Sequence, residues 1–261
     1  MHPDPLELVR RYADPADREV AGLVCAVLAL GGVAVILRSA GIVLEALGDR
    51  PARNLARQSD ARLRARLDGF RHRFFDGGDL ACLLGAVRDA RKEAGGLERF
   101  LVDGDDRSEA DYATGASALV RALVVRAPRR PDGKPAWPGN LLPDPARGSA
   151  SKRTFMYLRW MVRRDEVDPG GWDLCDPARL VVPLDTHMGA ACRALGLVSR
   201  KADDLKAARE ATAAFRLYDA RDPVRWDFAL TRPGINPDLV AGACFDCLDE
   251  RLAYPGDGLR A

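Results

Sequence analysis

Lys152 and Asp185 are the residues in this sequence whose types and positions best suit covalent chemistry. Lys152 directly follows the turn Gly148-Ser149-Ala-Ser151 and begins a segment with helical periodicity. The positive end of a helix dipole disfavours an ammonium group and so favours the neutral amine, which is the nucleophilic form. A lysine that contacts a phosphate without reacting would suit this position equally well, because free backbone amides at a helix start also bind anions.

Asp185 lies 33 residues further along the chain, in the segment Val182-Pro-Leu-Asp-Thr186-His187, directly before another predicted helix. A carboxylate at this place could stabilise a developing cation and help keep a nearby amine neutral. It could also serve only as the N-cap of the helix that follows. For His187, in the first turn of that helix, an exposed or hydrogen-bonded structural histidine is the commoner interpretation.

The basic residues are concentrated in one part of the chain. The whole sequence has a net charge of +2, but residues 121–164 contain eleven Lys or Arg against only Asp132 and Asp144. Such segregation is typical of proteins that bind a polyanion, nucleic acid above all, although a basic surface that is merely solvated remains an alternative.

A helical wheel of residues 151–164 separates an apolar stripe from a second stripe of Lys152, Met156, Arg159 and Arg163. We expect the first stripe to pack and the second to form an exposed basic ridge. Together with the turn before it, this ridge would hold the phosphates of a nucleic acid. The residues expected at the DNA backbone are Gly148, Ser149, Ser151, Arg153, Arg159, Arg163, Thr186 and His187.

The composition predicts an all-α fold, because Ala, Leu, Arg and Glu dominate and runs of strand-favouring residues are scarce. A first helix should begin at Asp14-Pro15, and the six prolines between Pro128 and Pro145 predict a loop. Further helices are expected at 36–47, 52–68, 79–93, 108–125, 151–164, 186–195, 203–217, 223–229 and 237–252.

An apolar run of eighteen residues, Val20–Leu37, approaches the length of a membrane span. The glycines within it and the acids Asp17 and Glu19 before it favour a buried central helix instead. The six cysteines are scattered, and the pair Cys244 and Cys247 lacks a second pair at ligand spacing. We therefore expect free thiols in a reducing cytoplasm, no metal centre and no membrane anchor.

The segment Ser151-Lys-Arg-x-x-x-x-Leu-Arg-Trp-Met-Val-Arg163, together with Val-Pro-Leu-Asp185-Thr-His, resembles the helix-hairpin-helix DNA glycosylase superfamily. It is closer to the archaeal 8-oxoguanine glycosylase branch, and to a bacterial family related to it, than to the endonuclease III branch. In the archaeal branch a similar spacing separates the catalytic lysine and aspartate, which implies Lys152 as nucleophile and Asp185 as its carboxylate partner. The segments 14–37 and Arg73-Phe74 also look like the bacterial family.

The resemblance extends to Asp222 and Trp226, whose spacing is similar to that of two residues that hold the extruded base in the archaeal enzymes. Met156 and Phe155 are expected beside that base. At i and i+4 the aspartate and the tryptophan would share a helix face, so that one accepts a hydrogen bond and the other stacks. A helix N-cap for Asp222 and a core position for Trp226 explain the same residues.

The sequence also departs from the superfamily pattern at two places. The turn before Lys152 has Gly148-Ser-Ala-Ser in place of Gly-hydrophobic-Gly, and Pro143 and Pro145 occupy the region of the first hairpin helix. Gly31 and Gly32 stand where relatives often present a polar pocket residue. The mode of phosphate binding and the base specificity are therefore not fixed by the resemblance.

The resemblance implies one helix-hairpin-helix unit over residues 1–261, with two helical lobes (50–184, and 1–49 with 185–261) on either side of a DNA-binding cleft. It further implies a monomeric, nucleoid-associated cytoplasmic enzyme that acts on damaged double-stranded DNA without a cofactor. The expected reaction is excision of an oxidised purine, 8-oxoguanine first, through a lysine Schiff base, with associated lyase activity. A non-catalytic DNA-binding protein of the same fold, a glycosylase for a different lesion and, more remotely, a membrane or scaffold protein are the alternatives.

Overall fold

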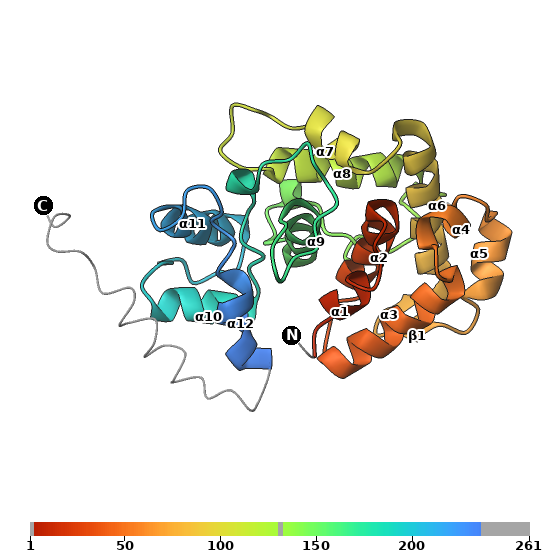
Figure 1. Cartoon of the computed structure of the whole chain (residues 1–261), viewed down its shortest axis with the longest axis horizontal. Helices are drawn as coiled ribbons and strands as arrows, with labels where there is room; N and C mark the ends of the chain where they lie inside the picture. The colour runs from red at the N-terminus through yellow and green to blue at the C-terminus, as the bar shows by residue number, and fades with distance from the viewer. Residues whose placement is uncertain (1–2, 130–132, 236–261) are drawn as a thin grey trace, which may run out of the picture.

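The computed structural model describes residues 3–129 and 133–235, and within these ranges the protein is almost entirely helical (Figure 1). The prediction of an all-α fold is confirmed at the level of secondary structure. The α-helices are α1 (Leu6–Val9), α2 (Pro15–Val27), α3 (Val33–Leu47), α4 (Pro51–Leu55), α5 (Asp60–Arg66), α6 (Gly77–Ala94), α7 (Glu98–Asp103), α8 (Ala113–Arg126), α9 (Lys152–Val162), α10 (Thr186–Ala194), α11 (Leu205–Arg216) and α12 (Asp227–Ile235). The short elements are the strands β1 (Arg71–His72) and β2 (Phe75–Asp76) and the 3-10 turns η1 (Pro145–Arg147) and η2 (Pro177–Arg179).

Most helix boundaries follow from local capping. The Asp14 side chain accepts a hydrogen bond of 2.9 Å from the Ala16 amide, and Pro15 occupies the first position of α2, as the sequence predicts. The single helix expected over 52–68 is wrong, because Ser59 caps a new helix and the chain forms α4 and α5. The helix expected over 237–252, with Cys244 and Cys247, lies outside the described residues.

The apolar run Val20–Leu37 forms parts of two helices, with a break at residues 28–32 where Gly31 has a positive φ of 103°. In the part of the chain that the structure describes, no helix has the length and apolar character needed to cross a membrane. Instead α2 is buried and packs against α9 and against α1, α3 and α4. The expectation of a buried segment is confirmed for residues 20–28, but Gly31, Gly32, Ala34 and Val35 are exposed, and the run forms parts of two helices and not one.

Glu19 is a buried acid in α2 that the core accommodates through its partners. Its Oε1 accepts hydrogen bonds of 2.8 Å from the Leu97 amide and from the Trp172 indole, and its carboxylate pairs with Arg91. A charge in the interior is tolerated when it is paired and hydrogen-bonded in this way. Glu19 therefore ties α2 to α6 and to the chain after α9.

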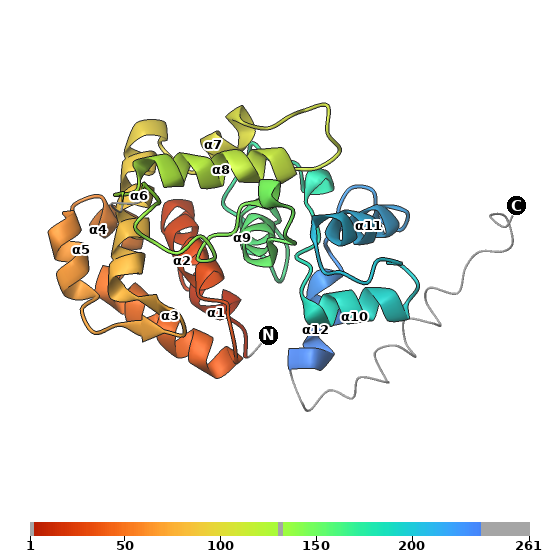
Figure 2. The same cartoon turned by 180° about the vertical axis from the view of Figure 1, so that it is seen from behind.

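The helices divide into groups around α9 (Figures 1 and 2). Helices α1 to α6 gather on one side, α10 to α12 gather on the other, and α7 and α8 run across one end. Because α9 lies between the two groups, the residues of its first turn can face both of them. Lys152, the first residue of α9, therefore lies where the two groups of helices face each other.

A small hairpin that the sequence did not predict joins α5 to α6. Strands β1 and β2 pair antiparallel, with Arg71 opposite Asp76 and His72 opposite Phe75. The strands are too short for an alternating pattern to be recognised. His72 is buried and its Nδ1 lies 2.9 Å from Oγ of Ser39, so the base of the hairpin is fixed to α3.

Candidate active site

A pocket of about 710 Å³ opens where the first turns of several helices meet. Lys152 enters it from the start of α9, and Asp185 enters it from the residue that caps α10. Asp227, the first residue of α12, and the Gly31-Gly32 segment before α3 complete the wall. A larger pocket of about 850 Å³ lies at α4 and α6, but its lining is mainly arginines and aspartates, several of which pair with one another.

The structure brings the two predicted catalytic residues together. Nζ of Lys152 lies 3.1 Å from Oδ2 of Asp185, and the two side chains are 32% and 25% exposed. The other carboxylate oxygen, Oδ1, accepts a hydrogen bond of 2.9 Å from the Met188 amide. Asp185 is therefore both a helix cap and an ion-pair partner of the lysine, so its capping role does not prevent it from facing the amine.

The two carboxyls of the pocket have opposite electrostatic environments. For Asp185, burial raises the pKa, but the charge of Lys152 and the Met188 amide outweigh it, and the net effect is a lowered pKa. For Asp227, burial raises the pKa and outweighs the opposing effects of Arg159 and Lys152. Asp185 is thus the carboxylate that stays ionised beside the lysine, and different environments of this kind commonly separate the roles of two acids.

The turn before α9 exposes unpaired amides to the pocket. After η1, Gly148 has φ 82° and Ser151 has φ 43°, and the two serine hydroxyls, Ser149 Oγ and Ser151 Oγ, lie 2.9 Å apart. Within the described chain, the amides of residues 152–154 donate no hydrogen bond to protein atoms. Ser149 and Ser151 line the pocket, as do the exposed Thr186 and His187. The Leu205 amide donates to the Gly148 carbonyl at 3.0 Å, which anchors this turn to α11.

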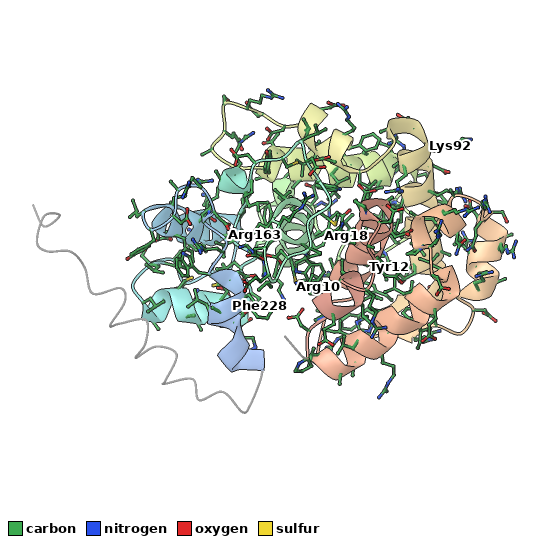
Figure 3. The ribbon with its side chains drawn as sticks, viewed as in Figure 1. Arg10, Tyr12, Arg18, Lys92, Arg163 and Phe228 are labelled. Carbon is green, nitrogen blue, oxygen red and sulfur yellow. The ribbon has the colours of Figure 1, made fainter. Side chains whose placement is uncertain are left out.

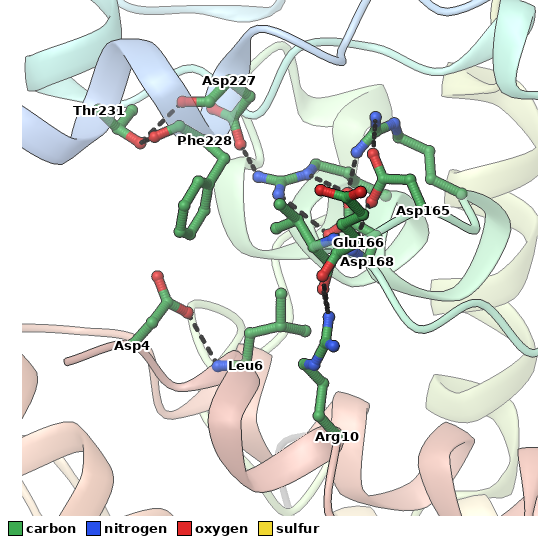
Figure 4. Close-up of polar contacts among 12 residues, drawn as sticks. Asp4, Leu6, Arg10, Asp165, Glu166, Asp168, Asp227, Phe228 and Thr231 are labelled. Atoms are coloured by element: carbon green, nitrogen blue, oxygen red, sulfur yellow. Dashed lines mark hydrogen bonds and ion pairs between the residues drawn. The ribbon is translucent and has the colours of Figure 1, made fainter. Parts of the chain in front are cut away.

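The predicted basic ridge on α9 is wrong. Arg159 is only 4% exposed and donates two hydrogen bonds of 3.0 Å to Asp168, which is fully buried (Figure 4). It also donates to Asp227. All of these acceptors are inside the protein, so the guanidinium is paired with carboxylates even though Arg159 is among the residues that line the pocket.

Arg163 and Arg153 are likewise buried, although Arg153 also lines the pocket. Arg163 is buried and pairs with Asp165, Asp168 and Asp222 in the region that Figure 3 shows between the helix groups. The guanidinium of Arg153 donates to the carbonyls of Val27, at 2.5 Å, and of Asn140. Burial lowers the Arg153 pKa to about 10. The charges of Arg159 and Arg163 are therefore neutralised by carboxylates of the same protein.

Three of the four residues expected around an extruded base do not reach the pocket. Met156 lines it, but Phe155 is 1% exposed in the core. Asp222 is held by Arg163 through contacts of 2.9–3.0 Å, and Trp226 packs against the core, with its indole nitrogen buried and without a described partner. The expected position beside the pocket is therefore not observed for Phe155, Asp222 and Trp226.

The residues that take their place are Asp227, Phe228 and Thr231, all on α12. In Figure 4 the Phe228 ring projects from α12 into the space between that helix and the N-terminal segment at Asp4. A helix expected from residue 223 begins four residues later, at Asp227, so a different face of the segment turns toward the pocket. The Asp222-Pro223 pair predicted that the helix starts at Pro223. In the structure Pro223 lies before the helix, which starts at Asp227.

No group of three or more potential metal ligands occurs among the residues that the structure describes. The four described cysteines, Cys25, Cys82, Cys175 and Cys192, carry free thiols, and burial raises the pKa of each. These thiols lie away from the pocket lining. The reactive groups available there are an amine, carboxyls, hydroxyls and an imidazole.

One comparison with known proteins gives a match. The family described as "Protein of unknown function (DUF2400)" matches residues 4–236, a range that includes every pocket residue named above. No curated protein and no solved structure matches the chain.

Proposed function

This chain belongs to the DUF2400 family, and we propose that it is a DNA glycosylase with lyase activity that excises an oxidised purine, 8-oxoguanine first, from damaged duplex DNA. The observation that carries the proposal is the contact of 3.1 Å between Lys152 and Asp185 in a pocket large enough for a nucleobase. An amine beside an ionised carboxylate, with unpaired amides in the same wall, supplies a nucleophile, a cation stabiliser and a phosphate contact.

The reaction would start from the neutral amine of Lys152, after its proton has passed to water. As the bond from C1′ to the base nitrogen breaks, the base leaves with the bonding electrons and C1′ becomes cationic. The ionised Asp185 stabilises this charge, and the lysine nitrogen forms the new bond to C1′. Opening of the sugar then gives an iminium ion with a protonated O4′, and loss of a 2′ proton expels the 3′ phosphate. A strand break therefore accompanies base release.

The pocket walls give the extruded base its surroundings. Met156 from α9 and Phe228 from α12 both line the pocket and can contact a flat ring. Asp227 and Thr231 offer polar atoms on the same wall. In this proposal the α1–α6 and α10–α12 groups act as the two lobes, and the DNA lies across the pocket between them. This division differs from the expected one, because α1–α3 group with α4–α6 and not with the C-terminal helices.

The test is reduction with borohydride during incubation with a duplex that carries 8-oxoguanine. A glycosylase of this type gives a covalent protein–DNA adduct, because borohydride reduces the Schiff base. DNA binding without an adduct on any member of a lesion panel would indicate a non-catalytic DNA-binding protein and would refute the enzymatic proposal.

Asp185→Asn should lower the rate of adduct formation by about 100-fold or more, with DNA affinity changed less than threefold. Asparagine can still cap α10 by accepting from the Met188 amide, so the fold is retained while the charge beside Lys152 is lost. Single-turnover trapping and fluorescence anisotropy measure the two quantities. Asp204→Asn is the matched control, since Asp204 caps α11 in the same manner through the Ala207 amide.

The pH dependence tests the same carboxylate independently. Because the pKa of Asp185 is lowered, the group stays ionised as the pH falls from 8 to 5 and gains its proton only below its ordinary range. The ratio of the wild-type rate to the Asp185→Asn rate should therefore stay constant over this interval. A ratio that falls steadily toward 1 between pH 7 and 5 would mean that the carboxyl titrates there and is not the ionised partner.

A further inference from the structure

Phe74 is an exposed aromatic residue that the site described so far does not use. It lies in the two-residue turn of the β1–β2 hairpin and is 71% exposed, whereas the next residue, Phe75, is 1% exposed. A single exposed apolar side chain is common on protein surfaces, so the significance of Phe74 depends on the backbone, the pocket and the charges around it. Of these two adjacent phenylalanines, Phe75 lies in the core and Phe74 is exposed to solvent.

The hairpin presents Phe74 rigidly. His72 is bonded to Ser39 of α3, Phe75 is buried in the core, and the Gly77 amide donates to the Phe70 carbonyl at 3.0 Å. Burial lowers the pKa of His72 below its ordinary value, so the anchor is neutral at pH 7. Little conformational freedom is left for the turn to lose when it binds a partner.

The turn also lies beside the pocket. Arg73, which precedes Phe74 and has φ 53°, extends its guanidinium over Gly31, a residue of the pocket wall. A Cβ atom at position 31 would lie 2.9 Å from Nη1 of Arg73. Gly31 thus permits a direct contact between the hairpin turn and the rim of the pocket.

The charge around the turn suits a polyanion. Arg38 on α3, Arg71 on β1 and Arg73 are all exposed. The side chains of Arg38 and Arg71 make no ion pair or hydrogen bond with any other residue that the structure describes, and the Arg73 guanidinium lies 5.7 Å from the Phe74 ring centre. An apolar side chain flanked by free cations, next to a pocket for a base, is the arrangement by which proteins wedge open a base step.

We propose that Phe74 enters the base stack of duplex DNA and fills the space that the extruded nucleotide leaves, with Arg38, Arg71 and Arg73 on the flanking phosphates. This inference rests on the proposed function, because it assumes a nucleotide in the Lys152 pocket. It assigns to the hairpin the opening of the duplex and leaves the chemistry to Lys152 and Asp185.

The first experiment measures duplex opening without chemistry. A duplex with 2-aminopurine beside 8-oxoguanine is titrated with Lys152→Ala protein, and unstacking raises the fluorescence of the probe. Adding Phe74→Ala to this protein should reduce the fluorescence rise at saturation at least about threefold, whereas adding Phe74→Leu should retain most of the rise. The control is Val125→Ala, which shortens another exposed apolar side chain and should leave the fluorescence rise unchanged. A full fluorescence rise with Phe74→Ala, or no rise with the parent, overturns the proposal.

The second experiment separates opening from catalysis in the otherwise wild-type chain. Phe74→Ala should slow borohydride trapping about tenfold or more on the duplex, and less than twofold on a single strand with the same lesion, where no stack needs opening. Equal losses on both substrates would overturn the wedge role. If the wild-type protein gives no adduct with either the duplex or the single strand, the glycosylase proposal fails. The fluorescence experiment still decides whether Phe74 opens the duplex.

Discussion

Lys152→Ala protein should form no borohydride-trapped adduct and should release base at least about a thousandfold more slowly than wild type, while it binds duplex DNA with nearly unchanged affinity. The reason is that only this amine lies beside Asp185, at 3.1 Å, among the described pocket residues. The side chain is partly exposed, so its loss creates little cavity and the fold should persist. Gel analysis of the reduced mixture and anisotropy with a labelled duplex measure the two quantities.

Lys152→Arg distinguishes a nucleophile from a phosphate contact. Arginine keeps the positive charge and can still pair with Asp185, but its guanidinium is not deprotonated near neutral pH and so cannot form the Schiff base. We expect this variant to be as inactive as Lys152→Ala and to bind DNA as the wild type does. Activity restored by arginine would show that the residue contributes charge alone. Lys201→Ala, at an exposed lysine outside the pocket, serves as the control.

The second large effect concerns stability. Arg159→Met should lower the free energy of unfolding by about 3–5 kcal/mol, because it leaves the buried carboxyl of Asp227 without its cation and removes one of the two arginines that pair with Asp168. Methionine fills much of the same space, so the loss reflects charge more than volume. Urea unfolding followed by circular dichroism measures the change, and adding Asp227→Asn should recover part of it.

Arg164→Met provides the matched comparison on the same segment. Arg164 pairs with Asp173 at 3.0 Å, but the two side chains are largely exposed, so the change should cost less than about 0.5 kcal/mol. An Arg159 variant as stable as this control, with weakened DNA binding, would restore the ridge interpretation and contradict the buried network.

The sequence was sufficient to predict most helices, for a physical reason. Asp14-Pro15 and Asp185-Thr186 are local caps whose hydrogen bonds form within three residues, so their effect can be inferred without the fold. The contact between Lys152 and Asp185 was inferred from a resemblance and not from local geometry. In the structure it depends on α9 and α10 starting at the same pocket.

The basic ridge was wrong because helical periodicity does not distinguish a solvated charge from one neutralised by the fold. The partners of Arg159 are Asp168, nine residues on, and Asp227, sixty-eight residues on. The acid-rich segment Asp165-Glu-Val-Asp168 directly after the helix was the available signal for internal pairing. The long-range contact with α12 could be known only from the tertiary structure.

Several helices begin at the pocket, and their N-terminal ends affect the departing base as well as the lysine amine. The first turns of α9, α10 and α12 contribute to the wall, and Gly32 caps the start of α3 there. The N-terminal end of each helix has an effective charge of about +0.5 from its aligned peptide dipoles. Four such ends around one cavity create a positive electrostatic potential that belongs to the backbone. A base that departs as an anion would be stabilised by that potential, and no single side-chain substitution would remove it.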